Sequence, residues 1–129
     1  MKTILVDAIY SFVLEDKSIF KEMYELLETF PNRKILLTGA SGGRFKEFGL
    51  DKVPYEVFTL EQNPAKSDPN YYKKMLNHFN LNSNEVVYFE HNDEAVKSAE
   101  SVGIKTYHYD PDKKDLQSLK DFLTKHLDK

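Results

Sequence analysis

The 129-residue chain has no cysteine, no tryptophan and no long apolar run. The absence of cysteine excludes disulfide bonds, thiolate-held metal sites, iron–sulfur clusters and a cysteine nucleophile. It also fits the reducing cytoplasm, where we expect the protein to be located. No segment approaches the roughly 18 apolar residues that a membrane span needs, and Asp7 interrupts the first apolar run too early for a signal peptide. We therefore predict no membrane partner.

The chain also lacks an excess of positive charge. Its 18 lysine and arginine residues stand against 21 aspartate and glutamate residues, which gives a net charge of -3. A nucleic-acid partner is not expected, because binding to phosphate backbones depends on basic patches. The apolar fraction of 40% includes eight tyrosines and nine phenylalanines, enough for a packed core. A chain of this length is typical of one domain, so we predict a single domain over residues 1–129.

Apolar segments of strand length alternate with segments of helical periodicity along the chain. The pattern predicts strands at 4–6, 35–37, 55–60, 86–89 and 104–109, and a small hairpin around 12–14. It predicts helices at 18–30, 44–48, 69–79, 93–102 and 116–127, with N-caps at Asp68 and Asn92 and C-caps at Gly49 and Gly103. Strands that are apolar throughout and alternate with helices indicate an α/β fold, a three-layer, doubly wound, mostly parallel five-stranded sheet.

Polar residues follow these strands at the points where ligands bind in such folds. Asp7 ends the first strand, Thr38 the second and Glu90 the fourth, while Lys66 follows the third. A carboxylate can attack phosphorus and form an aspartyl-phosphate, and a lysine can neutralise the charge. Carboxylates also hold Mg²⁺ beside a phosphate. These residue types together favour phosphoryl chemistry.

The order of these residues resembles the haloacid dehalogenase (HAD) superfamily over nearly the whole chain. Its first motif, an apolar strand that ends in Asp-x-Asp, is matched by residues 4–9, Ile-Leu-Val-Asp-Ala-Ile. The second, an apolar strand that ends in Thr or Ser, is matched by residues 35–38. The third is a lysine before a helix start, matched by residues 66–72, Lys-Ser-Asp-Pro-Asn-Tyr-Tyr. Residues 86–107 have the shape of the fourth, an apolar strand ending in acids, then a helix, a glycine and another strand.

The resemblance implies a Mg²⁺-dependent phosphatase that works through an aspartyl-phosphate. Asp7 would be the nucleophile and a metal ligand. The backbone carbonyl of Ile9 and the carboxylate of Glu90 would be the other metal ligands. Lys66 would steady the charge on nucleophile and phosphate.

The phosphate oxygens would be held after the second strand. Thr38 would offer its hydroxyl there, and Gly39 and Ala40 their backbone N–H groups.

The chain departs from the family pattern at three places. Family phosphatases carry a general acid two residues after the nucleophile, where this chain has Ile9. The acids of the fourth motif appear as Glu90-His91, and histidine is a poor ligand for Mg²⁺. No segment is long enough for a cap domain. We therefore expect slow or absent turnover of ordinary phosphate esters, with acyl phosphates least affected.

Two other interpretations remain open at this point. In the first, the chain is a catalytically inactive HAD-fold module for binding or interaction. In the second, it is a receiver-like phosphoacceptor, although the first strand supplies one acid, Asp7, rather than the acid pair that receivers need. The expected partner is a small phosphorylated molecule or an unidentified protein.

Overall fold

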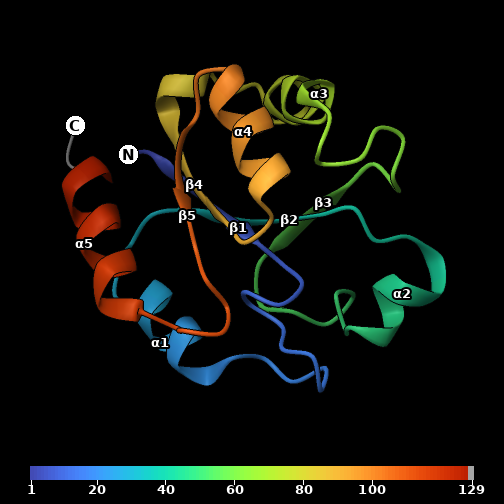
Figure 1. The fold of residues 1–129 in the computed structure, drawn as a ribbon, viewed down its shortest axis with the longest axis vertical. Helices are drawn as coiled ribbons and strands as arrows, with labels where there is room; N and C mark the ends of the chain where they lie inside the picture. Colours follow the sequence, from blue (N-terminus) through green and yellow to red (C-terminus); the bar gives the residue numbers. More distant parts are fainter. Residues whose placement is uncertain (128–129) are drawn as a thin grey trace.

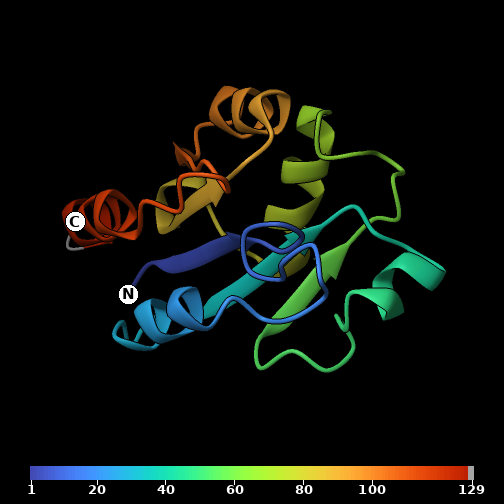
Figure 2. The ribbon, with the colours of Figure 1, turned by 60° about the horizontal axis from the view of Figure 1, so that its bottom comes forward.

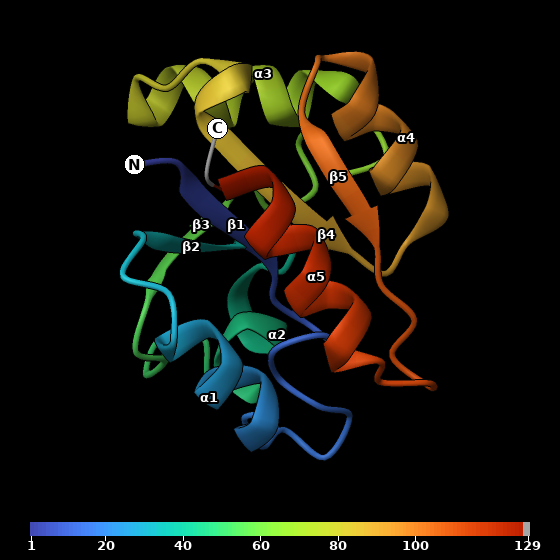
Figure 3. The same ribbon diagram turned by 90° about the vertical axis from the view of Figure 1, so that its left-hand side faces the viewer.

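Five strands form one parallel sheet in the computed structural model, which describes residues 1–127 (Figure 1). The strands are β1 (Thr3–Asp7), β2 (Lys34–Thr38), β3 (Glu56–Thr59), β4 (Val86–Glu90) and β5 (Lys105–His108). Their order across the sheet is β3-β2-β1-β4-β5, and every neighbouring pair is parallel. Figure 3 shows β4 and β5 side by side, with their arrows running the same way. The predicted fold class and the five predicted strands are confirmed, with no strand end shifted by more than one residue.

Helices cover both faces of this sheet. They are α1 (Lys21–Glu28), α2 (Gly42–Glu47), α3 (Pro69–Phe79), α4 (Asp93–Ser101) and α5 (Leu116–Leu127), with a short 3-10 turn, η1, at Ser83–Glu85. Figures 1 and 2 show α3 and α4 together over one face and α1 and α5 together over the other. No helix among the described residues is long and apolar enough to cross a membrane.

The core lies in two layers, one on each side of the sheet. Side chains of a strand alternate between its faces. Thus Leu5 packs with α3 and α4, while its neighbours Ile4 and Val6 pack with α1 and α5. All five residues of β1 are buried. This two-sided burial accounts for the consecutive apolar residues in the middle of the central strands.

The first helix begins three residues later than predicted. Residues 18–20 do not form the start of α1 but return antiparallel to the segment before them, with an isolated bridge between Val13 and Ile19. The backbone N–H of Leu14 donates to the Ser18 carbonyl, and that of Phe20 donates to the Phe12 carbonyl, each at 2.8 Å. The β-branched residues at this bridge favour extended backbone over helix. Residues 18–20, predicted as helix, therefore belong to the small hairpin predicted around 12–14.

The expected caps of α3 and α4 are present. Asp68 accepts a hydrogen bond from the Asn70 N–H at 2.9 Å, and Asn92 accepts one from the Ala95 N–H at 3.0 Å. Gly49 and Gly103 follow helix ends with φ of +65° and +89°, a backbone conformation that favours glycine. Helix α2 begins at residue 42, two residues before the predicted start.

The central strand of the sheet is β1, with β2 on one side and β4 on the other. The chain passes from β1 to one half of the sheet and later crosses to the other half. In doubly wound sheets such a reversal opens a crevice at the carboxyl ends of the strands. Asp7 ends β1 at this crevice.

Candidate active site

Strand register places the first-strand acid between the ends of its two neighbours. Asp7 pairs with Leu37, so Thr38 lies one position farther along on β2. On the other side Val6 pairs with Phe89, which brings Asp7 beside Glu90. Both carboxylates are buried, with exposed fractions of 1% for Asp7 and 0% for Glu90. The predicted convergence of these side chains at one edge of the sheet is what the structure shows.

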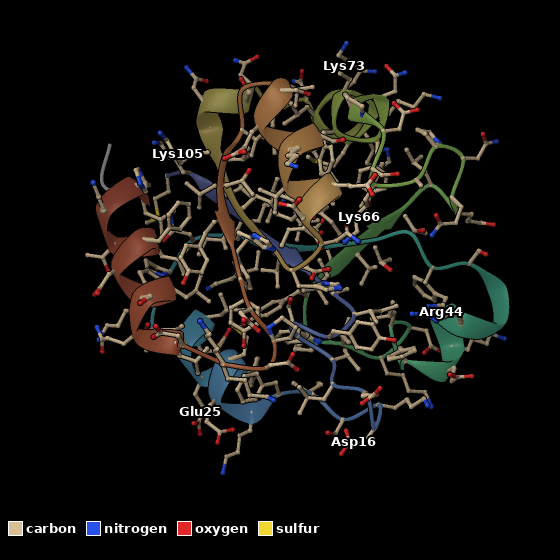
Figure 4. The ribbon with its side chains drawn as sticks, in the orientation of Figure 1. Asp16, Glu25, Arg44, Lys66, Lys73 and Lys105 are labelled. Atoms are coloured by element: carbon tan, nitrogen blue, oxygen red, sulfur yellow. The ribbon has the colours of Figure 1, made fainter. Side chains whose placement is uncertain are left out.

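Lys66 reaches this edge from the loop between β3 and α3, as Figure 4 shows. Its Nζ donates to Asp7 Oδ1 at 2.8 Å and to Glu90 Oε1 at 2.6 Å, and it also contacts the Leu37 carbonyl at 3.3 Å. The side chain is 15% exposed. Lys66 therefore bridges the two carboxylates with a largely buried ammonium group.

His91 bridges the other two oxygens of the same carboxylates. Its Nδ1 is hydrogen bonded to Asp7 Oδ2 and lies 3.2 Å from Glu90 Oε2. The backbone N–H of His91 also donates to Asp7 Oδ2 at 3.2 Å. The imidazole thus faces both acids from the side opposite Lys66.

Three further groups of the chain donate to the two carboxylates. The Ser11 hydroxyl donates to Asp7 Oδ2 at 2.7 Å. The Tyr88 hydroxyl donates to Glu90 Oε1, and the Asn92 N–H donates to Glu90 Oε2 at 3.0 Å. Each of the four carboxylate oxygens therefore has at least one donor within the described part of the chain.

Burial and charge shift the pKa values in this cluster in opposite directions. Burial opposes the charged form of His91, but hydrogen bonds and charges of Asp7 and Glu90 outweigh it and raise the His91 pKa from 6.5 to about 10. Burial likewise opposes the Lys66 ammonium, yet the same two acids hold its pKa well above 10.5. The Glu90 pKa is lowered despite burial, because Lys66 and the hydrogen bonds from His91, Lys66 and Tyr88 stabilise the anion. The two acids therefore favour the protonated forms of both Lys66 and His91.

A cavity of about 290 Å³ opens beside this cluster. Its lining includes both acids, Lys66 and His91, together with Thr38, Gly39, Ala40, Gln62 and Arg44. Figure 4 shows Arg44 projecting from α2 and Lys66 near the end of the sheet. The residues predicted to bind phosphate, Thr38, Gly39 and Ala40, all line this cavity.

The Thr38 segment differs in one detail from the predicted phosphate cradle. The Ala40 N–H donates to Thr38 Oγ1 at 3.0 Å, so this amide points to the threonine instead of a ligand. The Thr38 hydroxyl keeps its own hydrogen to donate. Gln62 Nε2 donates to the Gly39 carbonyl at 2.8 Å and so closes over the turn.

Ile9 lines the cavity two residues after Asp7 and is 8% exposed. It forms an isolated bridge with Val13 and packs in the core layer of α1 and α5. Its side chain has no group that can transfer a proton. In the alignment with the first HAD motif, this position corresponds to the general acid of family phosphatases. Here it holds an apolar side chain.

Sequence reasoning did not identify three members of this cluster as site residues. Tyr88 lies two residues before Glu90, and this spacing on a strand puts both side chains on one face. The sequence alone was therefore sufficient to predict that Tyr88 lies beside Glu90. Ser11 follows Asp7 through an irregular turn in which Tyr10 has φ of +76°, and no periodicity predicts such a turn. His91 was noted only as a poor Mg²⁺ ligand.

The donor set does not fit Mg²⁺ well. Asp7, Glu90 and His91 offer three ligand atoms within 4.8 Å of one another, which is a group of the size that holds a metal ion. However, Mg²⁺ prefers carboxylate and water oxygens in an octahedral shell, and here one atom is an imidazole nitrogen. The carboxylate oxygens are also already bonded to donors of the chain.

No protein-family model and no curated protein matches the sequence. Solved structures do match. A protein of uncharacterised function from Corynebacterium glutamicum superposes with a TM-score of 0.67 at 12% identity, covering 96% of each chain. A HAD-family enzyme from Bacteroides thetaiotaomicron superposes with a TM-score of 0.66 at 13% identity, over 92% of this chain and 98% of that one. That structure is of an aspartate-to-alanine variant in complex with magnesium and inorganic phosphate.

A HAD-superfamily hydrolase of subfamily IA from Geobacter sulfurreducens is 24% identical, with a TM-score of 0.53. The match covers 67% of this chain and 44% of that one. At these identities the likenesses establish the fold. The protein therefore has the HAD-like fold, as its motif order indicated.

Proposed function

We propose that this protein is a HAD-fold phosphatase that acts through Asp7 and turns over ordinary phosphate esters slowly. The observation that carries the proposal is the ion pair of Asp7 with Lys66 at a cavity that also contains Thr38 and Gly39. A nucleophile, a charge-neutralising ammonium and a hydroxyl donor share one small space. This arrangement suits a small phosphorylated molecule.

The proposed reaction has two steps. A carboxylate oxygen of Asp7 attacks phosphorus, the phosphorus–oxygen bond to the leaving group breaks, and that group departs with the electron pair. Water then attacks the aspartyl-phosphate, which releases inorganic phosphate and restores Asp7. Lys66 and the Thr38 hydroxyl stabilise the negative charge during both steps. No step is assigned to Mg²⁺, because the donor set does not fit it.

Ile9 sets the expected substrate preference. General acid catalysis contributes about 10²–10⁴-fold to such reactions, and Ile9 cannot donate a proton to the departing oxygen. When the leaving group is an alkoxide, the reaction loses the whole of this rate contribution. A carboxylate leaving group needs no proton, so its departure is not slowed. The proposal therefore favours acyl phosphates over phosphate monoesters.

We expect phosphate release from acetyl phosphate to exceed that from ethyl phosphate, whose leaving group is an alkoxide, by at least about tenfold, a modest share of the acid-catalysis term. Asp7→Asn should reduce release to the rate without protein, while Asp121→Asn, at an exposed position on α5, should leave it unchanged. Phosphate release is measured directly in both assays. Equal rates for native protein and a folded Asp7→Asn variant would refute the assignment of the nucleophile.

A second candidate is supported by the bonding of the carboxylates. Every oxygen of Asp7 and Glu90 already has a donor, and these hydrogen bonds withdraw electron density from Asp7 and lower its nucleophilicity. A module that binds phosphate-bearing ligands or a protein without turnover would retain all of these bonds. The acetyl phosphate assay separates the two, because a binding module releases no phosphate.

A further inference from the structure

The two buried acids face each other through two pairs of oxygens, and a nitrogen of the chain bridges each pair. Lys66 Nζ bridges Asp7 Oδ1 and Glu90 Oε1 at 2.8 and 2.6 Å. His91 Nδ1 bridges Asp7 Oδ2 and Glu90 Oε2, the second of these at 3.2 Å. The space between the carboxylates is therefore closed from both sides by the protein.

A divalent cation shared by these carboxylates would need the same space. Mg²⁺ lies about 2.0–2.1 Å from its oxygen ligands. An ion that close to both Asp7 Oδ2 and Glu90 Oε2 would lie where the His91 ring nitrogen now meets them. The imidazole would have to leave or become a ligand, and Mg²⁺ binds imidazole poorly.

The His91 ring is held in this position by its surroundings. The ring of Tyr10 meets it edge to face, with centroids 5.5 Å apart. The backbone N–H of His91 donates to the same Asp7 oxygen that its ring contacts. The carbonyl of His91 contacts His108 Nε2 at 2.9 Å. Backbone and side chain thus fix the ring against the carboxylates.

We propose that the His91 side chain takes the place of a divalent cation between Asp7 and Glu90, and that the native site does not bind Mg²⁺. The inference concerns the same site as the proposed function, but it is tested by metal binding alone. A failed binding test leaves the phosphatase assay intact, and a failed assay leaves this inference intact.

Mg²⁺ titrations followed by calorimetry and by backbone amide NMR shifts test this inference. The native protein should show no saturable binding up to about 10 mM, since Mg²⁺ depends on free carboxylate oxygens. His91→Asp should bind at least about tenfold more tightly than native, because it removes the ring and adds a carboxylate ligand. His91→Ala, which only vacates the space, should fall between the two.

His78→Ala is the matched control, because it removes an exposed imidazole on α3 that does not line the cavity, and it should behave as native. Circular dichroism establishes that each variant is folded. Saturable Mg²⁺ binding by the native protein with a Kd below about 10 mM would overturn the inference. Folded His91→Asp and His91→Ala variants that bind no more tightly than native would also overturn it.

Discussion

Replacing Lys66 by methionine should lower the free energy of unfolding by about 3–5 kcal/mol, the usual cost of removing one partner from a buried ion pair. The ammonium donates to both Asp7 and Glu90, and each of these acids is almost fully buried. Methionine has a similar length but no charge and no donor. The two carboxylates would then share one remaining cation, His91. Urea denaturation measures the loss.

Lys97→Met provides the matched control. Lys97 pairs with Asp93 one helical turn away at 3.1 Å, and both side chains are well exposed. Such exposed helix pairs contribute only about 0.3–0.5 kcal/mol. Comparing Lys66→Met with Lys97→Met therefore separates the effect of breaking a buried ion pair from the effect of replacing any lysine by methionine. A loss below about 1 kcal/mol for Lys66→Met would show that this ion pair does not organise the site.

Stability should also depend on pH through His91. The pKa of this imidazole is raised from 6.5 to about 10 in the folded protein, so folding favours its protonated form. Its contribution is fully present below about pH 6.5 and is lost as the pH rises through about 10. The native protein should therefore exceed a His91→Gln variant in stability by about 2–4 kcal/mol near pH 6, a discounted conversion of that shift.

The difference between the two proteins should approach zero above about pH 10. Other groups of the protein also titrate between these pH values, and taking the difference between native and variant removes their shared contribution. Urea denaturation at a series of pH values gives both curves. A difference that stays constant with pH would mean that His91 is not protonated between the two acids.

The fold and the position of the site were predictable from the sequence, because parallel strands bring their carboxyl ends to one edge. Three apolar runs end in a polar residue, at Asp7, Thr38 and Glu90. Once the parallel sheet formed, these three ends had to lie at the same edge. Lys66 was identified by its place before the Asp68 cap. Each of these signals is local in the sequence.

The bonding within the site was not predictable in the same way. Whether Ser11 reaches Asp7 depends on a turn with a positive φ at Tyr10, and no residue pattern specifies that turn. The role of His91 depends on the rotamer that turns Nδ1 toward both acids. Similarly, residues 18–20 have helical spacing, but pairing with the preceding segment outweighs that local preference.

Reaction with acetyl phosphate in the presence of EDTA tests most directly whether Asp7 handles phosphoryl groups without a metal. The protein is quenched in acid and its intact mass and peptides are measured, with Asp7→Asn alongside. We predict one added phosphoryl group, located on Asp7, in the native protein with EDTA, and none in the variant. An adduct that forms only when Mg²⁺ replaces EDTA, or no adduct in folded native protein under either condition, would contradict the account.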